Sequence, residues 1–124
     1  MDCIFCKIIQ GEIPGEKVYE DEEVVGIMDI NPANKGHALI LPKEHYETYA
    51  DLPDELAGKI AKVTKKVAKG VMKATGVEGY NVLNNNHKVA GQLVGHVHFH
   101  VIPRYENDGI KIDMPTKEYE DNEL

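Results

Sequence analysis

The stretch that decides the fold runs from residue 96 to residue 103 and reads His96-Val97-His98-Phe99-His100-Val101-Ile102-Pro103. Histidine and apolar residues alternate in it, and alternate residues of a β-strand share one face. The three histidines therefore line one side, with successive Cα atoms about 6.6 Å apart. The apolar residues between them point to the other side, where they can be buried. The pattern predicts a strand over residues 96–103 and argues against a helix.

Three imidazoles on one strand face can serve more than one kind of chemistry. A neutral imidazole is a nucleophile, a general base or a metal ligand, and two histidines one residue apart on a strand suit zinc equally well. Three histidines within five positions favour a functional role over a solvated strand face. No aspartate lies close before this run or within it. Because metal-dependent hydrolases often use a carboxylate ligand, its absence favours nucleophilic chemistry.

The loop before this strand, residues 84–95, is polar and contains glycine. It carries three consecutive asparagines, Gly91 and Gln92. Such a loop can offer backbone N–H groups and side-chain amides to an anion.

Two cationic features have two interpretations each. Six lysines lie mostly off the apolar stripe of the helix predicted between Pro53 and Gly76; they form either an anion-binding surface or a solvated helix face, and we favour the solvated face. Arg104, the only arginine in the chain, directly follows the histidine strand. It would meet either a phosphate or a surface carboxylate, and the sequence favours neither.

Working outward, the rest of the chain predicts short strands, one long helix and polar turns. Pro, Gly and Asn separate short β-branched runs, which is typical of strands joined by hairpins. Apolar residues at three- and four-residue spacing predict the long helix, with Pro53 in its first turn and Gly76 at its end. The other expected elements are helical turns over 3–9, strands over 16–20, 23–29, 36–41 and 80–83, and an acidic tail over 108–124. This order favours an α+β fold with a mainly antiparallel sheet.

Length and charge exclude whole classes of function. The 124 residues suffice for a single domain spanning 1–124. The net charge is −7, from 14 Lys and Arg against 21 Asp and Glu, which argues against nucleic acid as a partner. No apolar run approaches the ~20 residues of a membrane span. The N-terminus lacks the basic and apolar segments of a signal peptide, so we expect a cytoplasmic protein.

The sequence closely resembles the histidine triad family of nucleotide hydrolases and transferases, in the branch of small nucleotide-binding proteins that act on nucleoside phosphoramidates. The resemblance covers about residues 3–105. The matching segments are the three alternating histidines, Ile4-Phe5-Cys6-Lys7-Ile8, Met28-Asp29-Ile30, Gly36-His37 to His45, and Gly91-Gln92. The resemblance implies a homodimer of α+β protomers, in which the five-stranded antiparallel sheet of each protomer joins that of its mate. The short N-terminal helix and the long helix complete each protomer.

The resemblance also implies a catalytic role for three histidines. His98 is the expected nucleophile: it attacks the α-phosphorus, displaces an amine or another leaving group, and forms a nucleotidyl-histidine that water then cleaves. This chemistry needs no metal in the family, because positioning and hydrogen bonding stabilise the phosphoryl oxygens. His100 resembles the residue that bonds the α-phosphate and the leaving group. His37 corresponds to a supporting histidine behind the triad.

The nucleotide-binding residues carry over in the same way. Asp29 and Ile30 match the ribose-binding pair, and a carboxylate at Asp29 can only accept from the two ribose hydroxyls. Asn85 and Gly91 match phosphate contacts in the loop, and Gln92 completes the matching loop segment. The implied ligand is a purine nucleotide or nucleoside phosphoramidate.

Leu93 departs from the pattern of close eukaryotic relatives. Their serine at this position hydrogen-bonds the phosphoryl group or the leaving atom. The backbone N–H of Leu93 can still donate, so we keep Leu93 in the nucleotide-binding set. The missing hydroxyl predicts weaker assistance to the leaving group and slower phosphoramidate turnover.

The pair Cys3 and Cys6 has three interpretations: a redox pair, half of a zinc site, or two buried thiols. A thioredoxin-like redox pair follows a strand, and none is predicted before residue 3. A structural zinc site needs two more ligands, commonly histidines, and the chain has six histidines. Bacterial and archaeal family members with this cysteine pair carry a zinc site of two cysteines and two histidines. The resemblance therefore implies structural zinc on Cys3, Cys6, His45 and His96.

Three hypotheses for function follow. The first is a nucleotidyl-histidine enzyme acting on a nucleoside phosphoramidate or related nucleotide. The second is a nucleotide-binding module whose catalysis is vestigial, which the leucine at position 93 keeps open. The third is a zinc-dependent hydrolase that uses His96, His98 and His100 as metal ligands.

Overall fold

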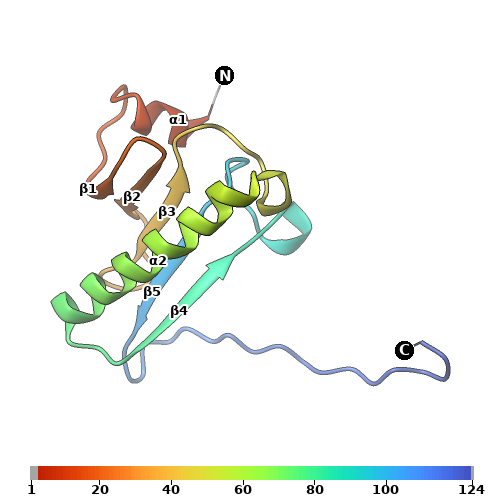
Figure 1. Ribbon diagram of the computed structural model, residues 1–124. Coiled ribbons are helices and arrows are strands. Elements are labelled where there is room, and N and C mark those ends of the chain that lie inside the picture. The colour runs from red at the N-terminus through yellow and green to blue at the C-terminus, as the bar shows by residue number, and fades with distance from the viewer. Residues whose placement is uncertain (1–2, 124) are drawn as a thin grey trace.

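The computed structural model describes residues 3–123, and Figure 1 shows the order of their elements. Met1 and Asp2, on which the expectation about a signal peptide partly rests, and Leu124 lie outside the described residues. The helices are α1 (Ile4–Ile9), α2 (Asp54–Thr75) and the short 3₁₀ turns η1 (Tyr49–Asp51) and η2 (Lys88–Ala90). The strands are β1 (Lys17–Glu20), β2 (Val24–Met28), β3 (Ala38–Pro42), β4 (Gly79–Asn84) and β5 (Phe99–Arg104).

The five strands form one antiparallel sheet in the order β1-β2-β3-β5-β4. Helix α2 lies across one face of this sheet (Figure 1), and α1 packs on the other face. The predicted α+β class, with a five-stranded antiparallel sheet, one long helix and a short N-terminal helix, is confirmed.

Two apolar cores lie on the two faces of the sheet. Successive residues of β2 and β3 alternate between them: Val24 and Ile40 pack with the α2 core, whereas Val25 and Leu41 pack with the α1 core. Both strands are therefore buried on both faces, which explains their nearly continuous apolar sequence. The α1 core also contains Cys3, Phe5 and Ile8, so the helix bearing the cysteine pair belongs to the folded body.

Helix α2 forms largely as its sequence predicts, but the predicted place of Pro53 in the first turn is wrong: with ψ at 144° Pro53 is the N-cap residue, and the helix begins at Asp54. Asp54 and Glu55 occupy the first turn, where the positive end of the helix dipole favours carboxylates. Gly76 ends the helix in the left-handed conformation at φ +77°, a region that favours glycine. The apolar stripe, including Ile60 and Val67, is buried, while most of the lysines are exposed. Lys59 pairs with Asp21 at 3.3 Å, as a solvated helix face would do.

The predicted start of the histidine strand is wrong, because β5 begins at Phe99 and not at His96. The backbone of residues 96–98 forms hydrogen bonds with a loop and with a side chain, and not with a neighbouring strand. The Val97 N–H donates to the Tyr46 carbonyl at 2.8 Å, and the Asn84 side chain donates to the His98 carbonyl at 3.0 Å. The alternation of faces persists nevertheless, since Val97 and Val101 lie in the α2 core.

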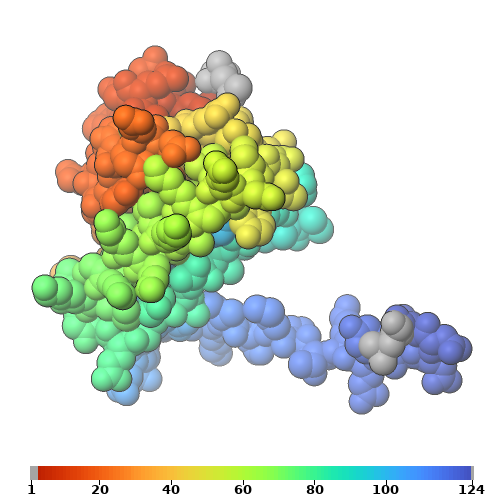
Figure 2. All heavy atoms as spheres, in the orientation of Figure 1, coloured from red at the N-terminus to blue at the C-terminus, as the bar shows by residue number. Residues whose placement is uncertain are grey.

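The C-terminal segment leaves the body after β5. Residues 111–123 are exposed throughout, and Figures 1 and 2 show them as an arm projecting away from the globular part. Within residues 3–123, no helix combines the length and apolarity that crossing a bilayer demands.

Candidate active site and metal cluster

A cleft of about 250 Å³ opens on the α1 side of the sheet. Helix α1 supplies one wall through Ile4, Phe5 and Ile8, and the end of β2 supplies another through Asp29 and Ile30. The remaining walls include Leu93, Val94, His98 and His100. A hollow of about 330 Å³ between α2 and β1 is lined mainly by apolar side chains and contains none of the histidines. The smaller cleft is therefore the candidate active site, because it is the one lined by His98 and His100.

His98 is held so that one ring nitrogen is free. Its Nδ1 lies 2.8 Å from the His96 carbonyl. A carbonyl only accepts, so Nδ1 carries the proton and Nε2 keeps its lone pair. Burial lowers the pKa of His98, and the side chain is only 6% exposed, so the ring is neutral near pH 7. The edge of Phe5 packs against it with ring centroids 4.9 Å apart.

His100 and His37 form a second pair beside His98. The Nε2 of His37 lies 2.9 Å from Nδ1 of His100, and the Ala33 N–H donates to Nδ1 of His37 at 3.0 Å. Burial lowers the pKa of His37, although the Asp29 carboxylate opposes it. Burial, with smaller contributions from His98 and His37, lowers the pKa of His100 to about 4. Both rings are therefore neutral near pH 7.

Asp29 stands at the end of β2, on the rim of this cleft. Its Oδ1 accepts the backbone N–H of Asn31 at 2.9 Å, and its Oδ2 lies 3.7 Å from Nε2 of His37. Ile30 beside it is 75% exposed, with its side chain on the cleft wall. The pair can thus contact a ligand from one side of the cleft.

The polar loop contributes unevenly to the cleft. Leu93 lines it and is 94% exposed. Gln92 is buried, and its side chain accepts from the His87 N–H and donates to the Glu47 carbonyl, so it holds the loop together. Asn85 packs against Gly91, where an added Cβ would meet the Asn85 side chain at 3.6 Å. Gln92, Asn85 and Gly91 lie outside the cleft lining given above, and their nucleotide contacts stay predictions.

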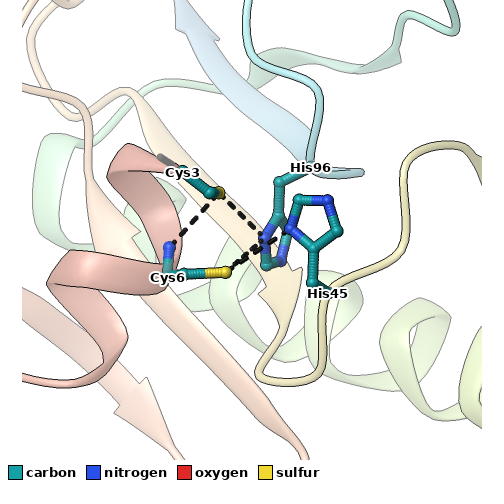
Figure 3. Close-up of side chains that lie close together, drawn as sticks. All are labelled: Cys3, Cys6, His45 and His96. Atoms are coloured by element: carbon teal, nitrogen blue, oxygen red, sulfur yellow. Dashed lines mark hydrogen bonds between the residues drawn. The ribbon is translucent and has the colours of Figure 1, made fainter. Parts of the chain in front are cut away.

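Cys3, Cys6, His45 and His96 converge in a second cluster, shown in Figure 3. The Sγ atoms of Cys3 and Cys6 lie 3.4 and 3.6 Å from Nδ1 of His96, and Sγ of Cys6 lies 3.4 Å from Nδ1 of His45. Tetrahedral zinc, with Zn–S of about 2.3 Å and Zn–N of about 2.05 Å, would separate sulfur and nitrogen by about 3.6 Å. These three sulfur–nitrogen distances thus already match the spacing in a zinc site, and all four donor atoms lie within 4.8 Å of one another.

The protonation of His96 also suits a metal. Its Nε2 lies 2.8 Å from the Pro42 carbonyl, so Nε2 carries the proton and Nδ1 directs its lone pair toward the sulfurs. The ring is fully buried, and burial lowers its pKa to about 4. Burial, followed by the neighbouring Cys3, raises the pKa of the Cys6 thiol to about 11. Two thiols and two imidazoles form a donor set that suits a divalent cation such as zinc, which would convert the two thiols to thiolates.

The arrangement counts against the triad as a metal site. Within residues 3–123, metal-ligating side chains converge in two groups: the cysteine–histidine cluster, and Asp29 with His37 and His100. Neither group unites His96, His98 and His100. His96 belongs to the cysteine cluster, whereas His98 and His100 line the cleft.

Arg104 meets a carboxylate of its own chain and not a phosphate. Its Nε and Nη2 donate to the Asp108 carboxylate at 2.8 and 3.0 Å, and Nη1 donates to the Asn81 side chain. Sequence reasoning missed Asp108, although an acid four residues after the only arginine was an available signal. It also missed Phe5 and Ala33. Phe5 could have been noticed in the apolar pattern of α1, but a backbone N–H such as that of Ala33 has no signature in sequence.

This chain is thus a small α+β protein with a histidine-lined cleft on a five-stranded antiparallel sheet and a cysteine–histidine cluster beside that cleft. The profile of the HIT domain matches residues 10–107. The chain therefore belongs to the histidine triad (HIT) family, as its resemblance predicted.

Curated relatives support this membership. An uncharacterised HIT-like protein of Methanocaldococcus jannaschii is 58% identical over 107 residues, 86% of this chain and 82% of the relative. The adenosine 5′-monophosphoramidase hnt1 of Schizosaccharomyces pombe is 45% identical over 117 residues, 94% of this chain and 85% of the relative. The adenylylsulfatase HINT3 of Arabidopsis thaliana is 44% identical over 107 residues, 86% of this chain and 54% of the relative.

Solved structures agree with the fold. A HIT family member from Bacillus subtilis has a TM-score of 0.90 at 45% identity, covering 94% of this chain and 84% of that chain. A HIT protein from Mycobacterium smegmatis, described as zinc-bound, has a TM-score of 0.83 at 36% identity, covering 94% of this chain and 85% of that chain.

Proposed function

We propose that the protein is a nucleotide hydrolase or transferase that acts at the α-phosphate of a nucleoside phosphoramidate or related nucleotide through a nucleotidyl-histidine on His98. The observation that carries this proposal is the hydrogen bond from Nδ1 of His98 to the His96 carbonyl, which leaves Nε2 unprotonated in a histidine-lined cleft. The names of the fission yeast and Arabidopsis relatives, a monophosphoramidase and an adenylylsulfatase, support this class of substrate.

The reaction follows from the atoms of the cleft. Nε2 of His98 forms a bond to the α-phosphorus, and the bond from phosphorus to the leaving nitrogen breaks. The departing amine gains a proton, for which Nε2–H of His100 is the proposed donor. Water then attacks the phosphorus, displaces His98 and returns a proton to His100. Asp29 and Ile30 are proposed to hold the ribose from the opposite wall of the cleft, and the chemistry itself needs no metal.

Zinc is proposed as a structural cofactor of the cysteine–histidine cluster. The ligands would be Cys3, Cys6, His45 and His96, whose donor atoms lie within 4.8 Å of one another. Bound there, zinc would crosslink the N-terminal cysteine pair at α1 to His45 and to the segment that precedes β5. The zinc-bound description of the Mycobacterium smegmatis structure supports this assignment.

A homodimer is proposed through the β4 edge of the sheet. Strand β4 is the last strand in the sheet order, so one of its edges can pair with another chain. Tyr80 and Val82 on it are 41% and 51% exposed, and they line a hollow of about 300 Å³ with Phe99 and α2 residues. An exposed apolar edge of this kind fits a second copy of the same chain.

The covalent intermediate provides the test. The protein is incubated with adenosine 5′-phosphoramidate, quenched in acid-free denaturant, and weighed intact by mass spectrometry. A mass increase of one adenylyl group in wild type, absent from His98→Ala, is expected, together with loss of nearly all hydrolysis in that variant. His98→Ala with wild-type turnover would end the proposal.

A second candidate rests on Leu93. The side chain lies exposed on the cleft wall with no hydroxyl to assist a leaving group, which favours a nucleotide-binding module with vestigial catalysis. AMP binding by calorimetry, with no measurable turnover of any phosphoramidate, would support this candidate. Faster turnover by Leu93→Ser, from a measurable wild-type rate, would support the enzyme instead.

A further inference from the structure

The backbone N–H of Ala33 contacts the histidine that lies behind the triad. It donates to Nδ1 of His37 at 3.0 Å, and His37 is 4% exposed. An N–H group only donates, so Nδ1 of His37 must keep its lone pair. The ring is buried and neutral, so its single proton lies on Nε2.

The proton on Nε2 of His37 then determines the state of His100. Nε2 of His37 lies 2.9 Å from Nδ1 of His100. Because His37 donates in this bond, Nδ1 of His100 accepts, and the proton of the neutral His100 ring lies on Nε2. Oδ2 of Asp29, 3.7 Å from Nε2 of His37, reinforces the same arrangement. His100 therefore presents an N–H donor and not a lone pair.

We propose that the Ala33 backbone N–H is a positioning group that sets His37 and His100 in the tautomers which make His100 a proton donor to the bound phosphoramidate. The role of His100 rests on the proposed function, whereas the tautomers themselves rest only on hydrogen bonds of this chain.

The path of the loop that carries Ala33 is fixed by the base of the C-terminal segment. The Asn34 side chain donates to the Pro103 carbonyl and to the Asp108 carboxylate, each at 2.9 Å. The Tyr105 hydroxyl donates to the Lys35 carbonyl at 2.8 Å. The residues directly after Ala33 are thus tied to β5 and to the segment beyond it.

The tautomer of His98 is also set by a backbone group, but by an acceptor and not by a donor. A backbone carbonyl, that of His96, accepts from Nδ1 of His98 and leaves a lone pair on Nε2. A backbone N–H, that of Ala33, acts through His37 and leaves a proton on Nε2 of His100. A backbone carbonyl thus sets the tautomer of the proposed nucleophile, His98, and a backbone N–H sets the tautomer of the proposed proton donor, His100, two residues further along the chain.

The first experiment reads the tautomers in the zinc-loaded wild-type protein. Imidazole 15N NMR at pH 7.5 without nucleotide distinguishes protonated from unprotonated ring nitrogens. The expected result is unprotonated Nδ1 and protonated Nε2 in both His37 and His100, with the reverse in His98. A protonated Nδ1 on His37 or His100 would overturn the inference, whatever the activity.

The second experiment deletes the donor. Incorporation of lactic acid in place of Ala33 exchanges the N–H for an ester oxygen, and Ala33→Gly is the matched control that keeps the N–H. The ester should populate protonated Nδ1 on His37 and His100 and lower kcat about tenfold or more at unchanged KM; Ala33→Gly should match wild type in both readouts. An ester protein with wild-type tautomers and kcat would refute the positioning role. If the tautomers shift as expected while His98→Ala forms the adduct, the proposed function fails and the tautomer assignment stands.

Discussion

At the scale of single residues, the imidazole rings of the triad differ in tautomer because their ring nitrogens have different hydrogen-bond partners. His96 donates from Nε2 to the Pro42 carbonyl and turns Nδ1 toward two sulfurs. His98 donates from Nδ1 to the His96 carbonyl and keeps Nε2 free for attack. His100 accepts at Nδ1. Three histidines that look alike in sequence thus differ in which ring nitrogen is unprotonated, which supports their proposed roles as ligand, nucleophile and donor.

The depressed pKa of His100 predicts a loss of stability in acid. Its pKa falls to about 4 in the fold, from the ordinary value of 6.5. Between these values the unfolded chain binds a proton that the folded chain does not, so stability decreases as the pH falls. Proton binding by this group in the unfolded chain should lower the free energy of unfolding at pH 5 by roughly 2 kcal/mol relative to its value at pH 7. Urea unfolding at pH 7 and pH 5 should show a smaller acid-induced loss in His100→Gln than in wild type, and equal losses would contradict the assignment.

At the scale of elements, α1 connects the cysteine–histidine cluster to the cleft. Cys3 and Cys6 begin and end a single turn, and Phe5 between them packs on the rings of both His96 and His98, with centroids 5.9 and 4.9 Å apart. The same helix forms a wall of the cleft. The position of α1 therefore affects both the shape of the cleft and the packing of His98, the proposed nucleophile.

Phe5→Ala tests the packing half of this connection. The side chain is 7% exposed in the α1 core, and truncation of a buried phenylalanine costs about 3 kcal/mol or more. Urea unfolding measures the loss, and Ile4→Ala, at a position 42% exposed on the same helix, serves as the control. Equal effects of the two substitutions would show that Phe5 has no special place in the core.

Cys6→Ser tests the metal half. Elemental analysis should find about one zinc per chain in wild type and nearly none in the variant, because a hydroxyl is a much weaker zinc ligand than a thiolate. Amide hydrogen exchange should be faster in α1 of the variant than in wild type while α2 stays protected. Wild-type zinc content in Cys6→Ser would remove this residue from the ligand set.

Periodicity predicted most elements, but not where β5 starts. The apolar spacing of α2 and the alternation through residues 97–101 are local properties, and both appear in the structure. The start at Phe99 depends on Tyr46 and Asn84, which lie far away in sequence. The four members of the cysteine–histidine cluster were reached through family resemblance. The Ala33 contact depends on the path of a loop, which composition does not encode.

At the scale of the whole molecule, the exposed β4 edge lies across the sheet from β1, with the histidine segment between them. Val82→Asp places a charge on this edge and should convert the proposed dimer to a monomer by sedimentation velocity. Val89→Asp is the matched control, because Val89 is 99% exposed in η2 and is not part of β4. A wild-type protein that sediments as a monomer at micromolar concentration would contradict the dimer.

The hydrogen-bond network around Asp108 marks the point beyond which the chain can be shortened without loss of the fold. The Asp108 carboxylate accepts from Arg104, Asn34 and the backbone of Tyr105 and Ile110, whereas the side chains of residues 111–123 are all exposed. A stop codon after Ile110 should leave a protein that melts cooperatively near the wild-type temperature, while one after Asn107 should lower the melting temperature clearly. Reporter domains fused beyond Ile110 should therefore leave the folded body and its proposed active site undisturbed.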